Sequence, residues 1–276
     1  MGLENVPGIL GWVAGGYLGL LVLLYVAQRS LLYHPTKVVP DPVRFGVPEM
    51  QTVHVPTADG LKLHCWWRPS AREDQATIVY FHGNAGHIGD RAFKARHFLN
   101  AGYGVLLVSY RYNADGGGRP SEAALYNDGR AAYRFVHAQG VSDDRIALYG
   151  ESLGSGVATK VATEHPVGAV ILEAPYTSIP DVAQKHYWYA PAKWLLRDRF
   201  ESIGRIDRVN APLLILHGEA DALIPVAFAK KLFAAAMEPK EAHFLPGGGH
   251  ADLYDFGADR IIIEFLNRKL ARAVAS

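Results

Sequence analysis

The stretch that decides the fold is YGESLGSG, residues Tyr149 to Gly156. It sets Ser152 between two glycines at the spacing G-x-S-x-G, after the apolar run RIALYG and before the small-residue run VATKVATEH. Such a pattern predicts a strand that turns sharply into a helix, with a serine at the apex and glycines that leave room for the turn. Because the chain has 28 glycines, the motif alone also fits an ordinary glycine-rich turn, so the surrounding sequence must decide.

Composition limits the classes of protein to consider. The 276 residues are 49% hydrophobic and 20% charged, which suits one large α/β domain. The 28 basic and 27 acidic residues form no long basic run, so we expect no nucleic-acid partner. The single cysteine, Cys65, excludes an intrachain disulfide and any multi-cysteine metal site, and its strand-like surroundings favour a packed core residue. We expect no cofactor and no metal.

The N-terminal segment differs from the rest of the chain. From Val6 to Ala27 no residue carries a charge, and as a helix this segment would span about 33 Å, enough for a hydrocarbon core of about 30 Å. We interpret residues 1–35 as a single-pass membrane anchor and residues 36–276 as the folded domain. A cleaved signal peptide fits less well, since only Glu4 is charged before the run and Tyr25 stands where a small residue is needed.

Flanking charges bear on the orientation of the anchor. Arg29, Lys37 and Arg44 follow the apolar run, which favours a cytoplasmic location for the domain. Glycines recur every four residues from Gly11 to Gly19, a helix-dimerisation spacing that is also common in membrane helices, so the oligomeric state stays open.

Beyond the anchor, apolar strand-like runs alternate with helix-like segments. Eight runs are candidate strands: TVHVP, LKLHCWW, TIVYFHG, GVLLVSY, RIALYG, AVILEAP, PLLILHG and EAHFLPG. The later runs are continuously apolar, as expected of parallel strands covered on both faces, and the first two form an antiparallel edge. The pattern predicts an α/β fold with a mostly parallel, eight-stranded sheet and helices on both faces.

Three strand ends carry the side chains of a serine hydrolase. Ser152 follows RIALYG, Asp221 follows PLLILHG, and His250 follows EAHFLP. Alone, Asp221 fits a helix-capping residue and His250 a surface residue, but the carboxyl ends of parallel strands meet at one edge of the sheet. The chain order Ser, Asp, His favours a catalytic triad with Ser152 as nucleophile, His250 as general base and Asp221 as its orienting partner. Leu153 is expected to supply one backbone N–H of the oxyanion hole.

Four motifs together resemble a known superfamily. The chain resembles the α/β hydrolases, and in particular the membrane-anchored Bem-like and depalmitoylase-like α/β-hydrolase-domain (ABHD) group. The motifs that carry this resemblance are YFHGNAG, YGESLGSG, LILHGEADALIP and LPGGGH, together with SLLYHP after the anchor. The resemblance implies the α/β-hydrolase fold from about Ser30 onward, the backbone N–H of Asn84 as second oxyanion donor, and a structural role for His82. The loop YRYNADGGGRPSE departs from the family's glycine-tyrosine-glycine turn, which leaves its substrate contacts open.

About 30 residues, 179–209, separate EAPYTS from the next strand and fit a small helical lid. Aromatic residues there and just before it are candidates for an acyl-chain pocket, although they also fit simple packing of the lid: Tyr176, Tyr187, Trp188 and Trp194.

Three functions follow from these observations. The first is a membrane-anchored serine hydrolase of carboxylic esters or acyl thioesters, acting on lipids or on acylated proteins. The second is an aminopeptidase-like serine peptidase, for which Glu173 or Asp181 could bind a free amino group. The third is a non-catalytic scaffold, disfavoured because no member of the triad is missing. Since the anchor holds none of the expected catalytic groups, a chain beginning near Thr36 is expected to keep its activity on short soluble esters.

Overall fold

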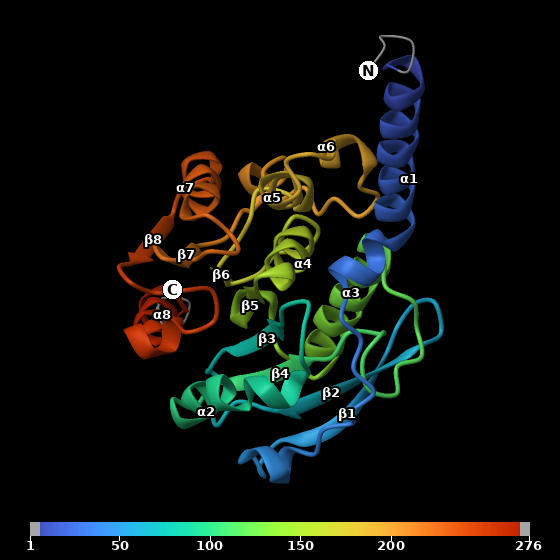
Figure 1. Ribbon diagram of the computed structural model, residues 1–276. Helices are drawn as coiled ribbons and strands as arrows, with labels where there is room; N and C mark the ends of the chain where they lie inside the picture. The colour runs from blue at the N-terminus through green and yellow to red at the C-terminus, as the bar shows by residue number, and fades with distance from the viewer. Residues whose placement is uncertain (1–5, 271–276) are drawn as a thin grey trace.

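The computed structural model describes residues 6–270 and contains one eight-stranded sheet between two layers of helices (Figure 1). The strand order is β1-β2-β4-β3-β5-β6-β7-β8; β2 is antiparallel to both β1 and β4, and all other pairs are parallel. The bounds are β1 (Gln51–Pro56), β2 (Lys62–Arg68), β3 (Thr77–Phe81), β4 (Gly104–Val108), β5 (Ile146–Glu151), β6 (Ala169–Glu173), β7 (Leu213–Gly218) and β8 (Lys240–Leu245). The predicted fold is confirmed, including its antiparallel edge.

Five helices cover the sheet. Helices α3 (Glu122–Ala138), α4 (Leu153–Ala162) and α7 (Val226–Ala235) pack on one face, and α2 (Ala92–Asn100) and α8 (Ala258–Leu270) pack on the other. Short 3-10 turns complete the connections: η2 (Pro42–Phe45), η3 (Ile88–Arg91), η4 (Asp143–Arg145), η5 (Ile206–Arg208) and η6 (Leu253–Phe256).

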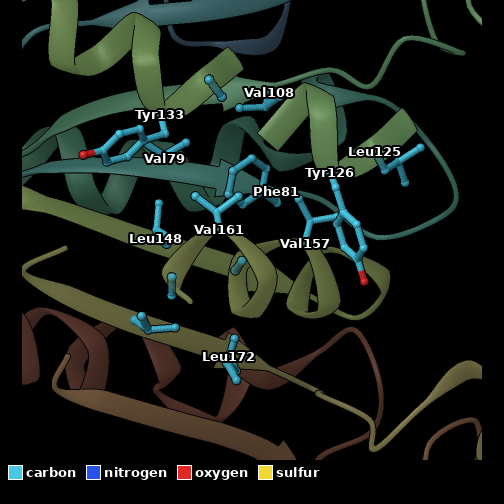
Figure 2. Close-up of a cluster of buried hydrophobic side chains, with 14 of the residues drawn as sticks. Val79, Phe81, Val108, Leu125, Tyr126, Tyr133, Leu148, Val157, Val161 and Leu172 are labelled. Carbon is cyan, nitrogen blue, oxygen red and sulfur yellow. The ribbon is translucent and has the colours of Figure 1, made fainter. Parts of the chain in front are cut away.

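The central strands are buried on both faces because their side chains alternate between two cores. On β3, Val79 and Phe81 point into the core under α3 and α4, whereas Ile78 and Tyr80 belong to the core under α2 and α8. Figure 2 shows the first of these cores, where Phe81 lies near Val157 and Val161 of α4. This double coverage explains the continuously apolar strand sequences.

The predicted lid contains two short helices, α5 (Ile179–His186) and α6 (Ala192–Leu195), which lie beside the N-terminal helix (Figure 1). The Ser178 side chain caps α5 by accepting a hydrogen bond from the Asp181 backbone N–H, and Pro180 stands in its first turn.

Helix α1 (Val6–Leu32) is apolar and long enough to cross a membrane; the candidate span is Leu10–Leu32, with a mean hydropathy of 1.9. It continues past Ala27, where the sequence predicts its end, because the polar residues that follow find partners in the lid segment. Gln28 accepts a hydrogen bond from the Arg197 backbone N–H at 2.8 Å, and Arg29 pairs with Asp198 at 2.8 Å.

Candidate active site

Ser152 occupies a strained turn between β5 and α4. Its φ of 50° and ψ of −118° lie in a region that residues other than glycine rarely adopt. Two backbone hydrogen bonds hold the turn: the Ser152 N–H donates to the Glu173 carbonyl and the Ser155 N–H to the Ser152 carbonyl, both at 2.8 Å. Hydrogen bonding to the neighbouring strand β6 thus fixes the serine at the carboxyl edge of the sheet.

The glycines of the motif are required by close backbone approach. A Cβ atom on Gly154 would lie 2.0 Å from the Phe81 carbonyl oxygen, and one on Gly150 would lie 2.5 Å from the Gly154 carbonyl oxygen. Both distances are far inside van der Waals contact. The G-x-S-x-G spacing therefore lets α4 start directly against the end of β3.

His250 and Asp221 approach Ser152 from the loops that follow β8 and β7, respectively. The His250 Nε2 atom lies 3.0 Å from Ser152 Oγ, and its Nδ1 atom lies 2.7 Å from Asp221 Oδ2. The loop that carries His250 is held over β7, since the Ala220 N–H donates to the Gly248 carbonyl at 2.9 Å. The structure thus brings together the three side chains that the sequence singled out.

Asp221 is fixed in position and in charge. Its Oδ1 atom accepts hydrogen bonds from the backbone N–H groups of Leu223 and Ile224, both at 2.8 Å. Burial opposes ionisation, but hydrogen bonds from His217 and His250 outweigh it and keep the pKa of this carboxyl well below its usual range. His217, buried and 3.3 Å from Asp221 Oδ2, was not predicted; its position within an apolar strand was the only sequence signal.

The loop after β3 lies beside Ser152. In the described part of the chain, the backbone N–H groups of Asn84 and Leu153 donate no hydrogen bond to another protein group, so both are free to bind an anion. His82 is fully buried, and burial lowers its pKa to about 3, so it stays neutral. Its Nδ1 atom lies 2.6 Å from the Gly83 carbonyl oxygen.

Charged residues lie buried directly beneath the serine turn. Glu151 directly precedes Ser152, and Glu173 of β6 is paired with Glu151 of β5 in the strand register. Lys94 of α2 bridges the two carboxylates, at 3.2 Å from Glu151 and 2.8 Å from Glu173, and Arg91 pairs with Glu151 at 2.8 Å. Burial opposes the charge on Glu151, yet Lys94 and Arg91 hold the pKa of its carboxyl well below its usual range. This network was not predicted.

A cavity of about 400 Å³ lies between α1 and the lid. One wall is formed by residues of α1: Leu24, Tyr25, Gln28, Leu31 and Leu32. Lid residues form the opposite wall: Ile179, Val182, Ala183, His186, Tyr187, Ala190, Ala192, Leu195 and Leu196. Asn84 and Leu223, beside the serine and aspartate loops, complete the lining, and the described lining residues include no acid.

Of the four aromatic candidates for substrate contact, only Tyr187 lines this cavity. Tyr176 is buried under α4, where its hydroxyl donates to the Leu153 carbonyl at 3.2 Å. Trp188 and Trp194 point outward and are 79% and 89% exposed. Composition alone revealed that the lid is aromatic but not the direction in which each ring points.

One group of possible metal ligands occurs among the described residues. His54, His64 and Asp115 place their donor atoms within 4.8 Å of one another, on the β1–β2 edge of the sheet and in the loop after β4. This edge is separated from the serine by β4 and β3, so the cluster has no part in the site.

Comparison with known proteins identifies the family. A family model described as serine aminopeptidase, S33, matches residues 72–204, which include the serine turn. The uncharacterized protein Rv2307c of Mycobacterium tuberculosis is 37% identical over 236 residues, covering 85% of this chain and 84% of the relative. The chain belongs to the α/β-hydrolase superfamily.

Two further comparisons relate this α/β hydrolase to lipases and esterases. The lysophosphatidylserine lipase ABHD12 of Danio rerio is 33% identical over 195 residues, covering 63% of this chain and 51% of that protein. The esterase Pf2001 of Pyrococcus furiosus shares the fold, with a TM-score of 0.68 at 19% identity over 86% of this chain and 100% of the esterase. The resemblance to the ABHD group is confirmed.

Proposed function

We propose that this α/β hydrolase is a membrane-anchored serine hydrolase that cleaves carboxylic esters or acyl thioesters through a Ser152 acyl-enzyme. The observation that carries the proposal is the unbroken chain of contacts from Ser152 Oγ to His250 to Asp221. A serine hydroxyl is a weak nucleophile at neutral pH, and a histidine held in this geometry can remove its proton during attack. The ionised Asp221 keeps the His250 tautomer with a proton on Nδ1 and stabilises its cation.

Catalysis then proceeds in two half-reactions. Ser152 Oγ bonds to the acyl carbon while its proton moves to His250, and the negative oxygen is stabilised by the Asn84 and Leu153 N–H groups. Collapse expels the alcohol or thiol, which takes the proton from His250, and leaves an acyl-serine. Water attacks this ester by the same route, giving the free acid and restoring Ser152. No cofactor is required for any of these steps.

The lining of the cavity favours acyl substrates over peptides. The description of the matching family model, serine aminopeptidase, makes a peptidase the second candidate function. An aminopeptidase needs a carboxylate that binds the free amino group of its substrate. Glu173, however, is fully buried against Lys94, and Asp181 is bonded to Thr177 at 2.7 Å and to Lys193 at 3.2 Å. The lipase name of the zebrafish relative supports a lipid ester as the substrate class.

A substrate panel tests the reaction class. We expect hydrolysis of p-nitrophenyl esters and acyl thioesters but not of aminoacyl amides, and covalent labelling of Ser152 by a fluorophosphonate. Ser152→Ala should lose the label and reduce turnover by on the order of a million-fold, because triad members act as a unit. Preference for the amides would favour the peptidase. Absence of labelling in the folded wild type would leave only a scaffold role.

We also propose that the α1 helix is retained in the membrane and that the catalytic domain faces the cytoplasm, from the basic residues that follow the apolar run. A phosphatase reporter fused to the C-terminus, active only after export, should show background activity. Strong reporter activity would reverse the orientation.

A further inference from the structure

We propose that the cavity between α1 and the lid is the acyl-chain site, that the membrane helix is one of its walls, and that a long acyl chain enters it sideways from the bilayer. This inference rests on the proposed function and names the substrate more closely, as a long-chain ester whose acyl group resides in the membrane. Four observations support it, and each concerns residues outside the triad.

The first observation is the chemistry and size of the cavity. Its α1 wall is made of Leu24, Leu31 and Leu32, with Tyr25 and Gln28 as the polar exceptions. Its volume of about 400 Å³ lies in the range of small-molecule sites, which also hold mainly apolar side chains and few polar groups. An apolar chain is therefore the ligand that suits it.

The second observation is that the cavity extends to the loop after β3, which lies beside Ser152. Asn84, the proposed oxyanion donor, is part of its lining. The same residue is tied to the end of α1, because its Nδ2 atom donates to the Leu32 carbonyl at 2.9 Å and its own carbonyl accepts from the His34 N–H at 3.3 Å. A chain lying along α1 can thus place its carbonyl end near the Asn84 loop.

The third observation is the depth of the lid along the candidate membrane span. The Tyr17 hydroxyl donates to the Tyr189 carbonyl at 2.8 Å, so the lid follows α1 from Arg29 back to Tyr17. This part of the helix rises by about 18 Å, more than half of a hydrocarbon core of about 30 Å. A lid packed along this much of the span lies in the adjacent leaflet.

The fourth observation is that the cavity is open to its surroundings and that the lid exposes two tryptophans. Trp188 and Trp194 are exposed, and aromatic residues of this kind are enriched at membrane interfaces. Lining residues Tyr25, Leu31 and Leu223 keep 37%, 48% and 47% of their surface exposed, so the cavity is not closed from its surroundings. An acyl chain enters the cavity through this opening.

The test compares two adjacent leucines of α1. Leu24 lines the cavity, whereas Leu23 is 63% exposed and absent from the lining. The measured quantity is the ratio of kcat/KM for p-nitrophenyl dodecanoate to that for p-nitrophenyl butyrate, using full-length protein in detergent micelles. Leu24→Trp should lower this ratio at least about tenfold, because it displaces two or more buried methylenes of the longer chain. Leu23→Trp should leave the ratio unchanged.

A second variant guards against misfolding of the first. Ala183→Phe narrows the cavity from the lid side and should lower the same ratio. Fluorophosphonate labelling of each variant reports whether the site is assembled. Equal ratios in Leu24→Trp, Ala183→Phe and Leu23→Trp, all labelled, would overturn the acyl-site inference while leaving the hydrolase intact. No ester hydrolysis and no labelling in the wild type would instead overturn the proposed function.

Discussion

At the scale of single residues, the site depends on a strained serine that its neighbours hold in place. A residue other than glycine at positive φ costs on the order of 1–3 kcal/mol, and Ser152 keeps this conformation because β6 and α4 bond to its backbone. The strain turns the hydroxyl out of the sheet edge toward His250. The tight contact of Gly154 with β3 is part of the same arrangement.

Gly154→Ala tests how tightly that turn is packed. The new Cβ would lie 2.0 Å from the Phe81 oxygen, so we expect the free energy of unfolding to fall by about 3 kcal/mol or more and labelling of Ser152 to be lost. Gly204→Ala is the matched control, since its Cβ meets no heavy atom within 4 Å. Urea unfolding measures both; equal midpoints for the two variants would contradict the packing argument.

A second residue-scale feature is the buried ion network under Ser152. Lys94, 3% exposed, compensates two carboxylates that the strand register places side by side. Removing one partner of a buried pair leaves an uncompensated charge, which costs about 3–5 kcal/mol. Lys94→Met should therefore destabilise the protein by about that amount in urea unfolding at neutral pH, whereas the exposed Lys231→Met should change little.

The pH dependence of this loss has a definite sign. The lowered pKa of Glu151 means that its ion pairs stabilise the fold above its unfolded-state pKa of about 4.3 and lose this effect as the pH falls through and below that value. The stability difference between wild type and Lys94→Met should therefore be largest near neutral pH and shrink in acid. A difference that stays constant from pH 7 to about pH 3, below this unfolded-state pKa, would exclude an ionic origin.

At the scale of elements, the sequence predicted the sheet well because burial on both faces leaves a continuous apolar signature in each central strand. The strand ends also predicted that Ser152, Asp221 and His250 meet, since parallel strands bring their carboxyl ends to one edge. The ion network was missed because it depends on register: YGE and ILE each end in glutamate, but only the pairing of β5 with β6 shows that the two acids meet. Ring directions in the lid depend likewise on tertiary packing.

The exposed face of the lid makes a prediction of its own. Replacing Trp188 and Trp194 together by alanine should slow hydrolysis of a long-chain ester in vesicles several-fold, because the lid loses its interfacial aromatic residues. Hydrolysis of p-nitrophenyl butyrate in solution should stay within about twofold, since neither ring lines the cavity. Met237→Ala, an exposed apolar residue after α7, is the control and should affect neither rate. An unchanged vesicle rate in the double variant would mean that the lid does not contact the membrane.

At the scale of the whole molecule, the apolar helix α1 and the hydrolase domain form one structure. The helix was predicted from its composition, but its contacts with the lid were not, because a uniformly apolar segment does not reveal which face it packs. The sequence signal for these contacts was Gln28 and Arg29, because two polar residues that continue the apolar helix need hydrogen-bonding or charged partners. These contacts alter the effect on activity that we expect from removing α1.

From the sequence alone, a chain beginning at Thr36 is expected to hydrolyse short soluble esters normally. The contacts of α1 predict the opposite: the truncation removes a wall of the cavity, the Leu32 carbonyl that anchors the Asn84 side chain, and the His34 N–H that binds its carbonyl. Because loss of an oxyanion donor costs on the order of a hundredfold in kcat, a loosened Asn84 loop should reduce turnover of p-nitrophenyl butyrate by about tenfold or more.

Asn84→Ala in the full-length chain distinguishes loss of the Asn84–Leu32 hydrogen bond from loss of the α1 side of the cavity. It deletes the side-chain hydrogen bond to the Leu32 carbonyl but keeps α1 and the Asn84 backbone N–H. It should lower kcat for p-nitrophenyl butyrate while the dodecanoate to butyrate ratio stays that of the wild type, whereas the truncated chain should lose both turnover and chain-length preference. Circular dichroism and thermal melting establish that each protein is folded. A folded truncate with wild-type turnover and chain-length preference would mean that α1 only holds the enzyme at the membrane, and that the cavity beside it is not used by the substrate.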